Sequence, residues 1–439
     1  MEYKSFPGGI HPPDAKKYSK NSSIADPPLP QKVIIPLLQH IGAPSKPVVK
    51  VGDEVKLGQK IAEAGGFVSI PMHASISGKI TNIAKFPHPA GLMQQAIEIT
   101  GNGKDDWIDL VDDENYFELS AEEIKKRIAE AGICGMGGAG FPTHVKLSPP
   151  QDKPIDTVIL NGVECEPYLT ADYRLMLERP EAIISGLKLL MKTVKAENGI
   201  IGIESNKPDA IKLFEELLKD EKNIKVTGLK LKYPQGAEKQ LIYAATGRKV
   251  PNQGGLPMSV GTVVQNVGTA VAVYEAVRYK KPLIQRVISV TGKIVKNPRN
   301  INARIGTLCK DLLEFCDGTT EEIGKVISGG PMMGFALFTL DTPIGKGSSG
   351  LLIMNKKEAS KNEESTCLRC GRCVDVCPMN LVPSLIASNV RYNDIKSAEK
   401  YGAMDCIKCG SCAYVCPSHI KLIQWIDIAK IKISEMRSS

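Results

Sequence analysis

Residues 367–378 read CLRCGRCVDVCP, and residues 406–417 read CIKCGSCAYVCP. Both stretches place four cysteines at the spacing C-x2-C-x2-C-x3-C and follow them with a proline. In this pattern three thiolates bind three corners of an iron–sulfur cubane, and the fourth cysteine reaches across to the other cluster. We therefore predict two 4Fe–4S clusters with exchanged fourth ligands, one held by Cys367, Cys370, Cys373 and Cys416, the other by Cys406, Cys409, Cys412 and Cys377.

Structural zinc is the alternative interpretation of such a segment. Zinc usually takes two separated cysteine pairs per ion, and two copies of four evenly spaced cysteines fit that pattern poorly. Soft thiolates in a reducing compartment also favour iron–sulfur chemistry. The other four of the twelve cysteines are scattered, and we expect buried structural thiols at Cys134, Cys165, Cys309 and Cys316.

Composition places the chain among soluble proteins of several domains. It has 439 residues, of which 42% are hydrophobic and 24% charged, and a formal net charge of +8. Basic residues do not gather into a tract, so no nucleic-acid partner is expected. The first residues lack the pattern of a secretion signal, which favours the cytoplasmic side. The uncharged stretch 253–274 contains glycines and a proline and suits a loop entering a helix, so no transmembrane helix is predicted.

The end of the chain predicts an amphipathic helix over residues 420–436. Its apolar face contains Leu422, Ile423, Ile426, Ala429 and Ile433. This face can pack against its own domain, which is the simpler interpretation, or dock on a membrane partner.

Upstream of the cysteines, the sequence divides into four parts. Residues 1–30 are rich in proline, glycine and serine and predict an extended arm. Residues 31–110 predict a small all-β module that resembles the lipoyl carrier fold with its two hammerhead halves. The turn that would present the modified lysine is Gly65-Gly66, so carrier chemistry is not expected. Residues 111–282 predict an α/β domain, 283–355 an α+β module, and 356–439 an all-α domain with the clusters.

Several elements of these parts are expected from capping and periodicity. A capping box at Ser120 opens a helix that stops at Gly132. The further expected elements are a strand over 157–160, a helix over 180–195, a strand over 199–204, a helix over 208–218 and a helical piece over 305–315.

A glycine-rich loop, GMGGAGFPT at residues 135–143, follows the first helix and is expected to precede a strand. Glycines let backbone amides approach a phosphate or a flat ring closely, and Lys146 just beyond supplies a counter-charge. The segment NGVECEP begins at Asn161, where a strand ends at the ligand edge of the sheet. QNVGT opens a helix at Asn266, where free amides can meet an anion. Together these segments predict a cofactor pocket.

In this order the segments resemble the flavin- and nicotinamide-binding subunit of respiratory complex I. With the β module before them and the cysteine motifs after them, residues 5–430 resemble the C subunits of Rnf complexes, which are ion-translocating ferredoxin:NAD oxidoreductases. This resemblance implies FMN, a substrate NAD(H), and a β-grasp fold for residues 283–355. The FMN residues it implies are Gly135, Gly137, Gly138, Lys146, Asn161, Glu164, Glu166, Gly236, Glu238, Asn266 and Thr269. As catalytic residues it implies Glu166, Glu238 and Phe141, the last stacked near the nicotinamide.

Two positions depart from the complex I pattern. Met136 stands where that family has arginine after the first glycine, and Val163 where it has aspartate. Flavin contacts are therefore expected to be fewer and looser. For Glu164, Glu166 and Glu238 the alternative is a solvated surface carboxylate.

The expected function follows from electron counting. NADH delivers two electrons together whereas a cubane accepts one, so a flavin must stand between them. The predicted protein exchanges hydride between NAD(H) and FMN and passes single electrons to partner subunits, among them an iron–sulfur ferredoxin-like subunit and integral membrane subunits. It would lie peripherally on the cytoplasmic face of the membrane. The alternatives are a cluster-only relay with a degenerate flavin pocket and an assembly scaffold, although a scaffold would not need eight ligand cysteines.

Overall fold

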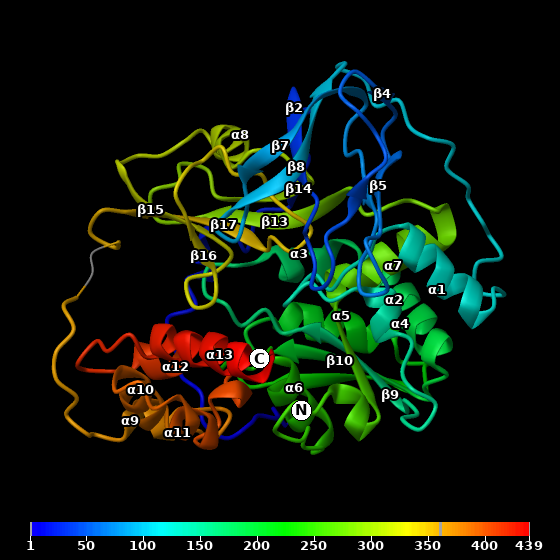
Figure 1. Ribbon diagram of the computed structural model, residues 1–439. Coiled ribbons are helices and arrows are strands. Elements are labelled where there is room, and N and C mark those ends of the chain that lie inside the picture. The colour runs from blue at the N-terminus through cyan, green and yellow to red at the C-terminus, as the bar shows by residue number, and fades with distance from the viewer. Residues whose placement is uncertain (1, 360–361, 439) are drawn as a thin grey trace.

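The structure is a computed structural model that describes residues 2–359 and 362–438. Figure 1 shows an all-β module at the top, an α/β domain at the right, a second sheet at the upper left, and a helical domain with the C-terminus at the lower left. The first residues, drawn in blue, pass between the α/β domain and the helical domain.

The N-terminal arm is extended, as predicted, but it also contains regular structure. Lys4 forms a parallel bridge with Leu229, and Ile10 an antiparallel bridge with Tyr233. A short 3-10 helix, η1 (Lys16–Tyr18), and a strand, β1 (Ile24–Ala25), follow. The sequence did not predict these two elements, because each is held by residues from much later in the chain.

Two small antiparallel sheets form the β module, with strand orders β2-β8-β7-β4 and β3-β5-β6. Their bounds are β2 Lys32–Pro36, β3 Lys46–Pro47, β4 Glu54–Val55, β5 Lys60–Glu63, β6 Met72–His73, β7 Gly78–Pro87 and β8 Met93–Gly101. The buried side chains of Ile61 and Ile97 belong to the same apolar cluster as Ile128 of the next domain. The module is therefore packed onto the α/β domain.

The α/β domain contains a four-stranded parallel sheet in the order β11-β10-β9-β12. Its elements are α1 Ala121–Glu130, α2 Thr143–Lys146, β9 Thr157–Gly162, α3 Ala171–Glu178, α4 Pro180–Val194, β10 Asn198–Glu204, α5 Pro208–Leu217, β11 Ile224–Leu229, α6 Glu238–Thr246, η2 Pro257–Val260, β12 Thr262–Asn266 and α7 Val267–Tyr279. The helices and strands predicted over 121–218 are confirmed to within two residues of each end. The Ser120 side chain caps α1 by accepting from the Glu123 amide.

Alternate residues of a strand face opposite sides of this sheet. Val158 and Leu160 pack with α4, α5 and α7 in the largest apolar cluster, whereas Ile159 and Val264 pack with α6 on the other side. Asn266 ends β12, and its register partner Asn161 is the next-to-last residue of the neighbouring β9. The fold therefore brings these two asparagines to one edge of the sheet.

A mixed six-stranded sheet, in the order β1-β14-β13-β17-β15-β16, forms the next module. Its elements are β13 Gln285–Thr291, β14 Arg299–Arg304, α8 Cys309–Phe315, β15 Ile323–Ser328, β16 Phe335–Leu337 and β17 Gly350–Asn355. The helix expected over 305–315 begins only at Cys309. Residues 305–308 connect β14 to it, and the Ile305 amide instead donates to the Ile284 carbonyl.

The last domain is helical, with α9 Arg372–Asp375, α10 Pro383–Arg391, α11 Ile395–Lys400, η3 Ala403–Asp405, α12 Ser411–Tyr414 and α13 Leu422–Ser438. The apolar face predicted for the last helix is buried within this domain, where Ile426, Ala429 and Ile433 pack with Ile386 and Ile395. This favours the simpler of the two interpretations of that face. Within residues 2–359 and 362–438, no helix has the length and apolarity needed to cross a membrane.

Candidate functional site

The eight cysteines of the repeated motif surround two cavities. Cys367, Cys370, Cys373 and Cys416 line the first, and Cys377, Cys406, Cys409 and Cys412 line the second. Each cavity thus takes three cysteines from one motif and one from the other. Among the described residues, no group of three or more Cys, His, Asp or Glu side chains is arranged to hold a single metal ion. Four thiols around each cavity, three of them from one motif, suit the corners of an iron–sulfur cluster.

The backbone repeats along with the cysteines. Arg369 and Lys408 are both left-handed, and their amides donate to the sulfurs of Cys367 and Cys406, each at 3.4 Å. Amide hydrogen bonds to cluster sulfurs are one of the levers by which proteins set cluster potentials. The two cavities are therefore built by the same local geometry.

The two cavities differ in their exposure. Cys367 and Cys370 are exposed, whereas Cys377, Cys409 and Cys412 are buried. Burial raises the pKa of the Cys377 and Cys412 thiols around the second cavity, because it disfavours the thiolate. Deprotonation of these thiols is therefore coupled to binding of a cationic iron–sulfur core, which would release their protons.

The buried cavity adjoins the α/β domain. The Gln240 side chain donates to the Pro378 carbonyl at 3.0 Å, and Tyr233 donates to the carbonyl of Cys409. Tyr233 and Cys409 share an apolar cluster with Ile10 of the arm, against which Cys165 packs. The second cavity is thus the inner one of the two.

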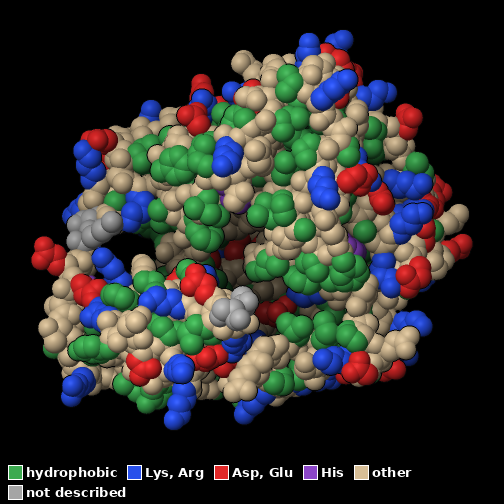
Figure 2. Space-filling model, in the orientation of Figure 1, with side chains coloured by type: hydrophobic (Ala, Val, Ile, Leu, Met, Phe, Trp, Pro, Cys, Tyr) green, Lys and Arg blue, Asp and Glu red, His purple; other side chains and the backbone are tan. Residues whose placement is uncertain are grey.

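In Figure 2 the surface is hollowed where the helical domain meets the modules above it.

The glycine-rich loop leads into a short helix, α2, and not directly into the expected strand, so Lys146 is the last residue of that helix. A Cβ atom on Gly137 would come within 2.8 Å of Nδ2 of Asn266, so the loop lies directly against the sheet edge. A Cβ atom on Gly138 would meet nothing within 4 Å. Backbone therefore borders open space at Gly138, as a flat ligand requires.

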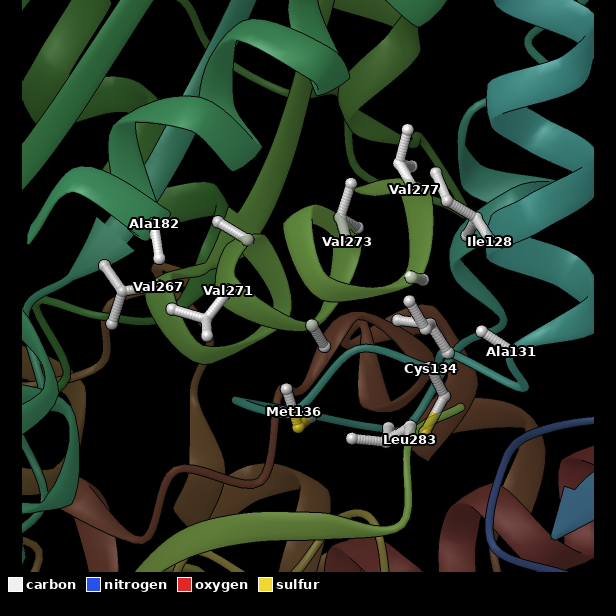
Figure 3. Packing of buried hydrophobic residues seen from close by; sticks show 14 of the residues in the cluster. Ile128, Ala131, Cys134, Met136, Ala182, Val267, Val271, Val273, Val277 and Leu283 are labelled. Atoms are coloured by element: carbon white, nitrogen blue, oxygen red, sulfur yellow. The ribbon is translucent and has the colours of Figure 1, made fainter. Parts of the chain in front are cut away.

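Met136 points away from this open space. Its side chain is 4% exposed and belongs to the large apolar cluster, and Figure 3 shows it beneath α7 with Cys134 nearby. The Met136 amide donates to the Thr269 hydroxyl at 3.0 Å. Replacing arginine by methionine at this position therefore anchors the loop in the core. Thr269, predicted as an FMN contact, is itself fully buried and holds the loop in place.

Other predicted pocket residues gather at the same edge. Asn266 caps α7 by accepting from the Gly268 amide, and its Nδ2 donates to Asp172 at 2.7 Å. Asn161 donates to the Gly236 carbonyl at 2.8 Å. These contacts join the ends of β9 and β12 to the segments that follow β9 and β11.

An ion pair and an unpaired amide complete this group. Lys146 and Glu238 form a part-exposed pair at 2.6 Å, and Phe141 in the loop is half-buried. Nε2 of the buried Gln235 has no partner in the structure, although hydrogen-bonding capacity is rarely left unused in a protein interior. Gln235 lies next to Gly236, whose carbonyl accepts from Asn161, so this unused donor adjoins the group of predicted pocket residues.

Glu164 and Glu166 are not solvated carboxylates, so that alternative is wrong for both. Glu164 accepts from the amides of Asp172 and Tyr173 at the start of α3, and its side chain is 5% exposed. Glu166 accepts from the amides of Met332 and Met333 in the following module. Burial raises the pKa of Glu166 to about 7.

Two lysines that the sequence did not single out hold the segment between Asn161 and Leu169. The Lys16 ammonium, from the arm, donates to the carbonyls of Glu164 and Leu169 at 2.8 and 2.5 Å. Lys207 donates to the Val163 carbonyl at 2.7 Å. Both lysines are buried. No local pattern marks this role, because the carbonyls that the two lysines hold lie far away in sequence.

Four family models match the chain. They are the RnfC barrel sandwich hybrid domain at residues 4–104, the Nuo51 FMN-binding domain at 128–275, the SLBB domain at 287–336 and the 4Fe-4S dicluster domain at 359–417. A relative in Clostridium ljungdahlii, the C subunit of a proton-translocating ferredoxin:NAD(+) oxidoreductase complex, is 54% identical over 385 residues, which are 88% of this chain and 84% of the relative.

This chain belongs to the RnfC family.

A second relative supports the same membership. The C subunit of the Na(+)-translocating ferredoxin:NAD(+) oxidoreductase complex of Acetobacterium woodii is 46% identical over 394 residues, which are 90% of this RnfC-family chain and 89% of the relative. The family resemblance expected from the sequence is therefore confirmed, and the chain contains a barrel sandwich hybrid, an FMN-binding, an SLBB and a 4Fe-4S dicluster domain.

Among solved structures, an NAD+-reducing NiFe hydrogenase in the air-oxidised state shares the fold with a TM-score of 0.51 at 17% identity. The match covers 72% of this RnfC-family chain and 64% of that one, so this chain spans less than two thirds of the hydrogenase chain. At this identity the likeness concerns the fold alone.

Proposed function

We propose that this chain exchanges electrons between NAD(H) and the other subunits of an Rnf complex, through FMN on the glycine-rich loop and two 4Fe–4S clusters. The observation that carries the proposal is the pair of cysteine-lined cavities, of which the inner one is joined to the flavin domain through Tyr233 and Cys409. Family membership supports the reaction.

FMN, when bound, exchanges an electron pair with NAD(H) and single electrons with iron–sulfur clusters. Gly135, Gly137 and Gly138 give it a close backbone surface, and Lys146, Asn161, Gly236 and Asn266 border the pocket. Thr269, Glu164 and Glu166 position these segments from behind, as their buried hydrogen bonds indicate. Phe141 and Glu238 lie at the more exposed side, where NAD(H) would enter.

The clusters would be held by exchanged ligands, as the lining of the cavities supports. The inner cluster uses Cys406, Cys409, Cys412 and Cys377, and the outer cluster uses Cys367, Cys370, Cys373 and Cys416. Because the inner site adjoins the flavin domain through Tyr233, it would be the first to accept electrons from that domain. The outer site, with two exposed cysteines, would be the one within reach of a partner.

The partners we propose are an iron–sulfur ferredoxin-like subunit and integral membrane subunits of the complex. The chain would lie peripherally on the cytoplasmic face of the membrane. We also propose a lipoyl-like hammerhead fold for residues 31–110 and a β-grasp fold for 283–355, between an arm at 1–30, the FMN domain at 111–282 and the cluster domain at 356–439. Two antiparallel sheets and a mixed sheet with one helix are consistent with these folds.

The test is anaerobic reconstitution with iron, sulfide and FMN, followed by absorbance scans before and after NADH. We expect about eight irons per chain, in keeping with two cubanes, and loss of flavin and iron–sulfur absorbance after NADH. Bound iron without bound FMN would instead support the cluster-only relay. The arginine-to-methionine change that motivates this relay is explained by core packing of Met136.

A loop variant tests the FMN position. Because Gly138 borders open space and is not required for a left-handed turn, Gly138→Leu should fold normally and still obstruct the pocket. We expect FMN retention to fall at least tenfold with iron content unchanged. The control is Ala64→Leu, which adds the same side chain at an exposed position of the β module. Normal FMN retention in Gly138→Leu would place the pocket elsewhere.

A further inference from the structure

The glycine-rich loop carries no charge of its own. Residues 135–143, GMGGAGFPT, contain no acidic or basic side chain. Two buried cations nevertheless contact backbone carbonyls in this region, one in the loop itself and one in the residues just before it. Both cations come from the part of the chain that follows the FMN domain. They are Arg286, near the start of β13, and Lys346, between β16 and β17.

Arg286 connects the loop to Lys346. Its side chain donates to the Lys346 carbonyl at 2.5 Å and lies 3.5 Å from the Met136 carbonyl, and the residue is 7% exposed. The guanidinium therefore reaches the loop backbone at Met136, two residues before Gly138, where a Cβ atom would meet nothing within 4 Å.

Lys346 holds the residue that leads into the loop. Its ammonium donates to the carbonyls of Gly132 at 2.6 Å and Pro71 at 3.2 Å, and the residue is 1% exposed. Gly132 packs so closely that a Cβ atom there would lie 2.6 Å from the ammonium nitrogen. The cation is thus enclosed at the junction of three modules.

Within the described part of the chain, neither cation has an acidic partner at contact distance. The ion pairs formed by residues 2–359 and 362–438 within 4.0 Å include neither Arg286 nor Lys346. Buried charges without a counter-ion are unfavourable, because desolvation is not repaid by a nearby opposite charge. Burial lowers the pKa of Arg286 to about 10 and that of Lys346 to about 8, with weaker opposition from Asp172 and Cys134. Both side chains therefore remain mostly protonated at neutral pH.

We propose that Arg286 and Lys346 act through their two positive charges, which would stabilise the negative charge that the FMN ring gains on reduction. The inference rests on the proposed function, since it requires FMN on this loop. Gly137, Gly138 and Ala139 present only backbone and one methyl group, which suits the flat ring. A negative charge on the reduced ring would then add to the weak counter-charge that Asp172 and Cys134 provide.

This assignment makes a prediction about potential and not only about binding. A charge that favours reduced over oxidised FMN raises the reduction potential, whereas a charge that binds the phosphate tightens both forms equally and leaves the potential unchanged. The measurement is a spectroelectrochemical titration of FMN in the full-length protein, together with FMN affinity in the oxidised state.

Two substitutions separate charge from positioning. Arg286→Gln removes the charge and keeps an amide donor. Arg286→Lys keeps the charge but replaces the planar guanidinium by an ammonium group. We expect Arg286→Gln to lower the FMN potential by at least ~30 mV, the equivalent of tenfold in the ratio of affinities for a two-electron couple. Arg286→Lys should remain near the wild-type value. The control is Lys310→Met, which removes an exposed cation of the same module.

Three outcomes would overturn the inference. An unchanged potential in Arg286→Gln excludes the electrostatic role, and weaker binding of oxidised FMN at an unchanged potential assigns the charge to the phosphate. Equal shifts in both variants assign a purely steric role. If Arg286→Gln does not fold, Lys346→Met against Lys346→Arg gives the same comparison. Wild-type protein that binds no FMN would instead contradict the proposed function itself.

Discussion

The hydroxyl of Tyr233 donates to the carbonyl of Cys409 at 2.8 Å, and this bond links the flavin domain to the inner cysteine cavity. Tyr233 is 1% exposed and opens the segment that contains Gly236 and Glu238. A contact between two domains at this point fixes the separation between the two proposed cofactor sites.

Removing the hydroxyl should weaken this link. In Tyr233→Phe the buried Cys409 carbonyl loses its partner, which costs about 1–3 kcal/mol. We expect a lower urea midpoint and slower cluster reduction after NADH in stopped-flow absorbance, with iron and FMN content unchanged. Tyr392→Phe, on the exposed surface of the cluster domain, is the control. Wild-type rates and stability in Tyr233→Phe would show that the bond does not set the domain arrangement.

The exchanged fourth cysteines predict two different losses. Cys377→Ala should remove the inner cluster and Cys416→Ala the outer one, so each variant should keep about four irons, the content of one cubane. After addition of NADH, the remaining cluster should be reduced in Cys416→Ala but stay oxidised in Cys377→Ala. The reason is that Cys377→Ala lacks the inner cluster, through which electrons would pass from the flavin to the outer one. Low-temperature EPR reads both states. Cys309→Ala, remote from both cavities, should keep about eight irons. Equal reduction in the two variants would contradict the proposed order.

Lys16 predicts a role for the N-terminal arm in the FMN site. Lys16→Met removes the donor to the Glu164 and Leu169 carbonyls and leaves the Glu164 carboxylate without its 3.9 Å partner. Removing one member of a buried pair costs about 3 kcal/mol. We expect a lower urea midpoint and at least tenfold weaker FMN binding by fluorescence titration. The exposed neighbour gives the control, Lys17→Met, and equal behaviour of the two variants would contradict this role.

Glu166 predicts a pH dependence of stability. Its pKa is raised from 4.5 to about 7, so the folded chain binds this proton more tightly than the unfolded chain does. The contribution is fully present below about pH 4.5 and is lost as pH rises through about 7, a change of about 3 kcal/mol. Asp172, with its pKa raised to about 6, acts in the same direction.

Urea unfolding at pH 5 and pH 8 measures this difference. Glu166→Gln should reduce the loss of stability between the two pH values by about 2–3 kcal/mol, because the amide does not titrate. Glu181→Gln, exposed in the first turn of α4, changes the net charge equally and should retain the wild-type loss. The same loss in both variants would remove Glu166 as its source.

Local patterns predicted the parts of this molecule that are locally determined. Cysteine spacing anticipated which thiols share a cavity, and Pro180 and Ser120 marked helix starts that the structure contains. The glycine loop was found by its composition. Its surroundings were not, because Arg286 and Lys346 resemble ordinary surface cations in the sequence and are buried only by packing between modules.

Contacts over long separations also give structural roles to residues that the sequence predicted only as cofactor contacts. Glu164 and Thr269 were predicted as cofactor contacts, and the structure shows them bonded to the α3 amides and to the Met136 amide. A sequence motif predicts which residues belong to a site. It does not distinguish residues that contact the ligand from residues that support the surrounding backbone, because the fold decides in which direction each side chain points.

The exchange of one cysteine between the motifs sets a limit on when the cofactors can be inserted. The first cavity has three cysteines by residue 373 and gains its fourth only with Cys416, in the second motif. A ribosome-bound chain therefore offers an incomplete first site until the whole stretch between the two motifs has been synthesised. Insertion of the first inorganic core must wait for the second motif, and a message truncated before residue 416 yields no chain with a fully ligated first site.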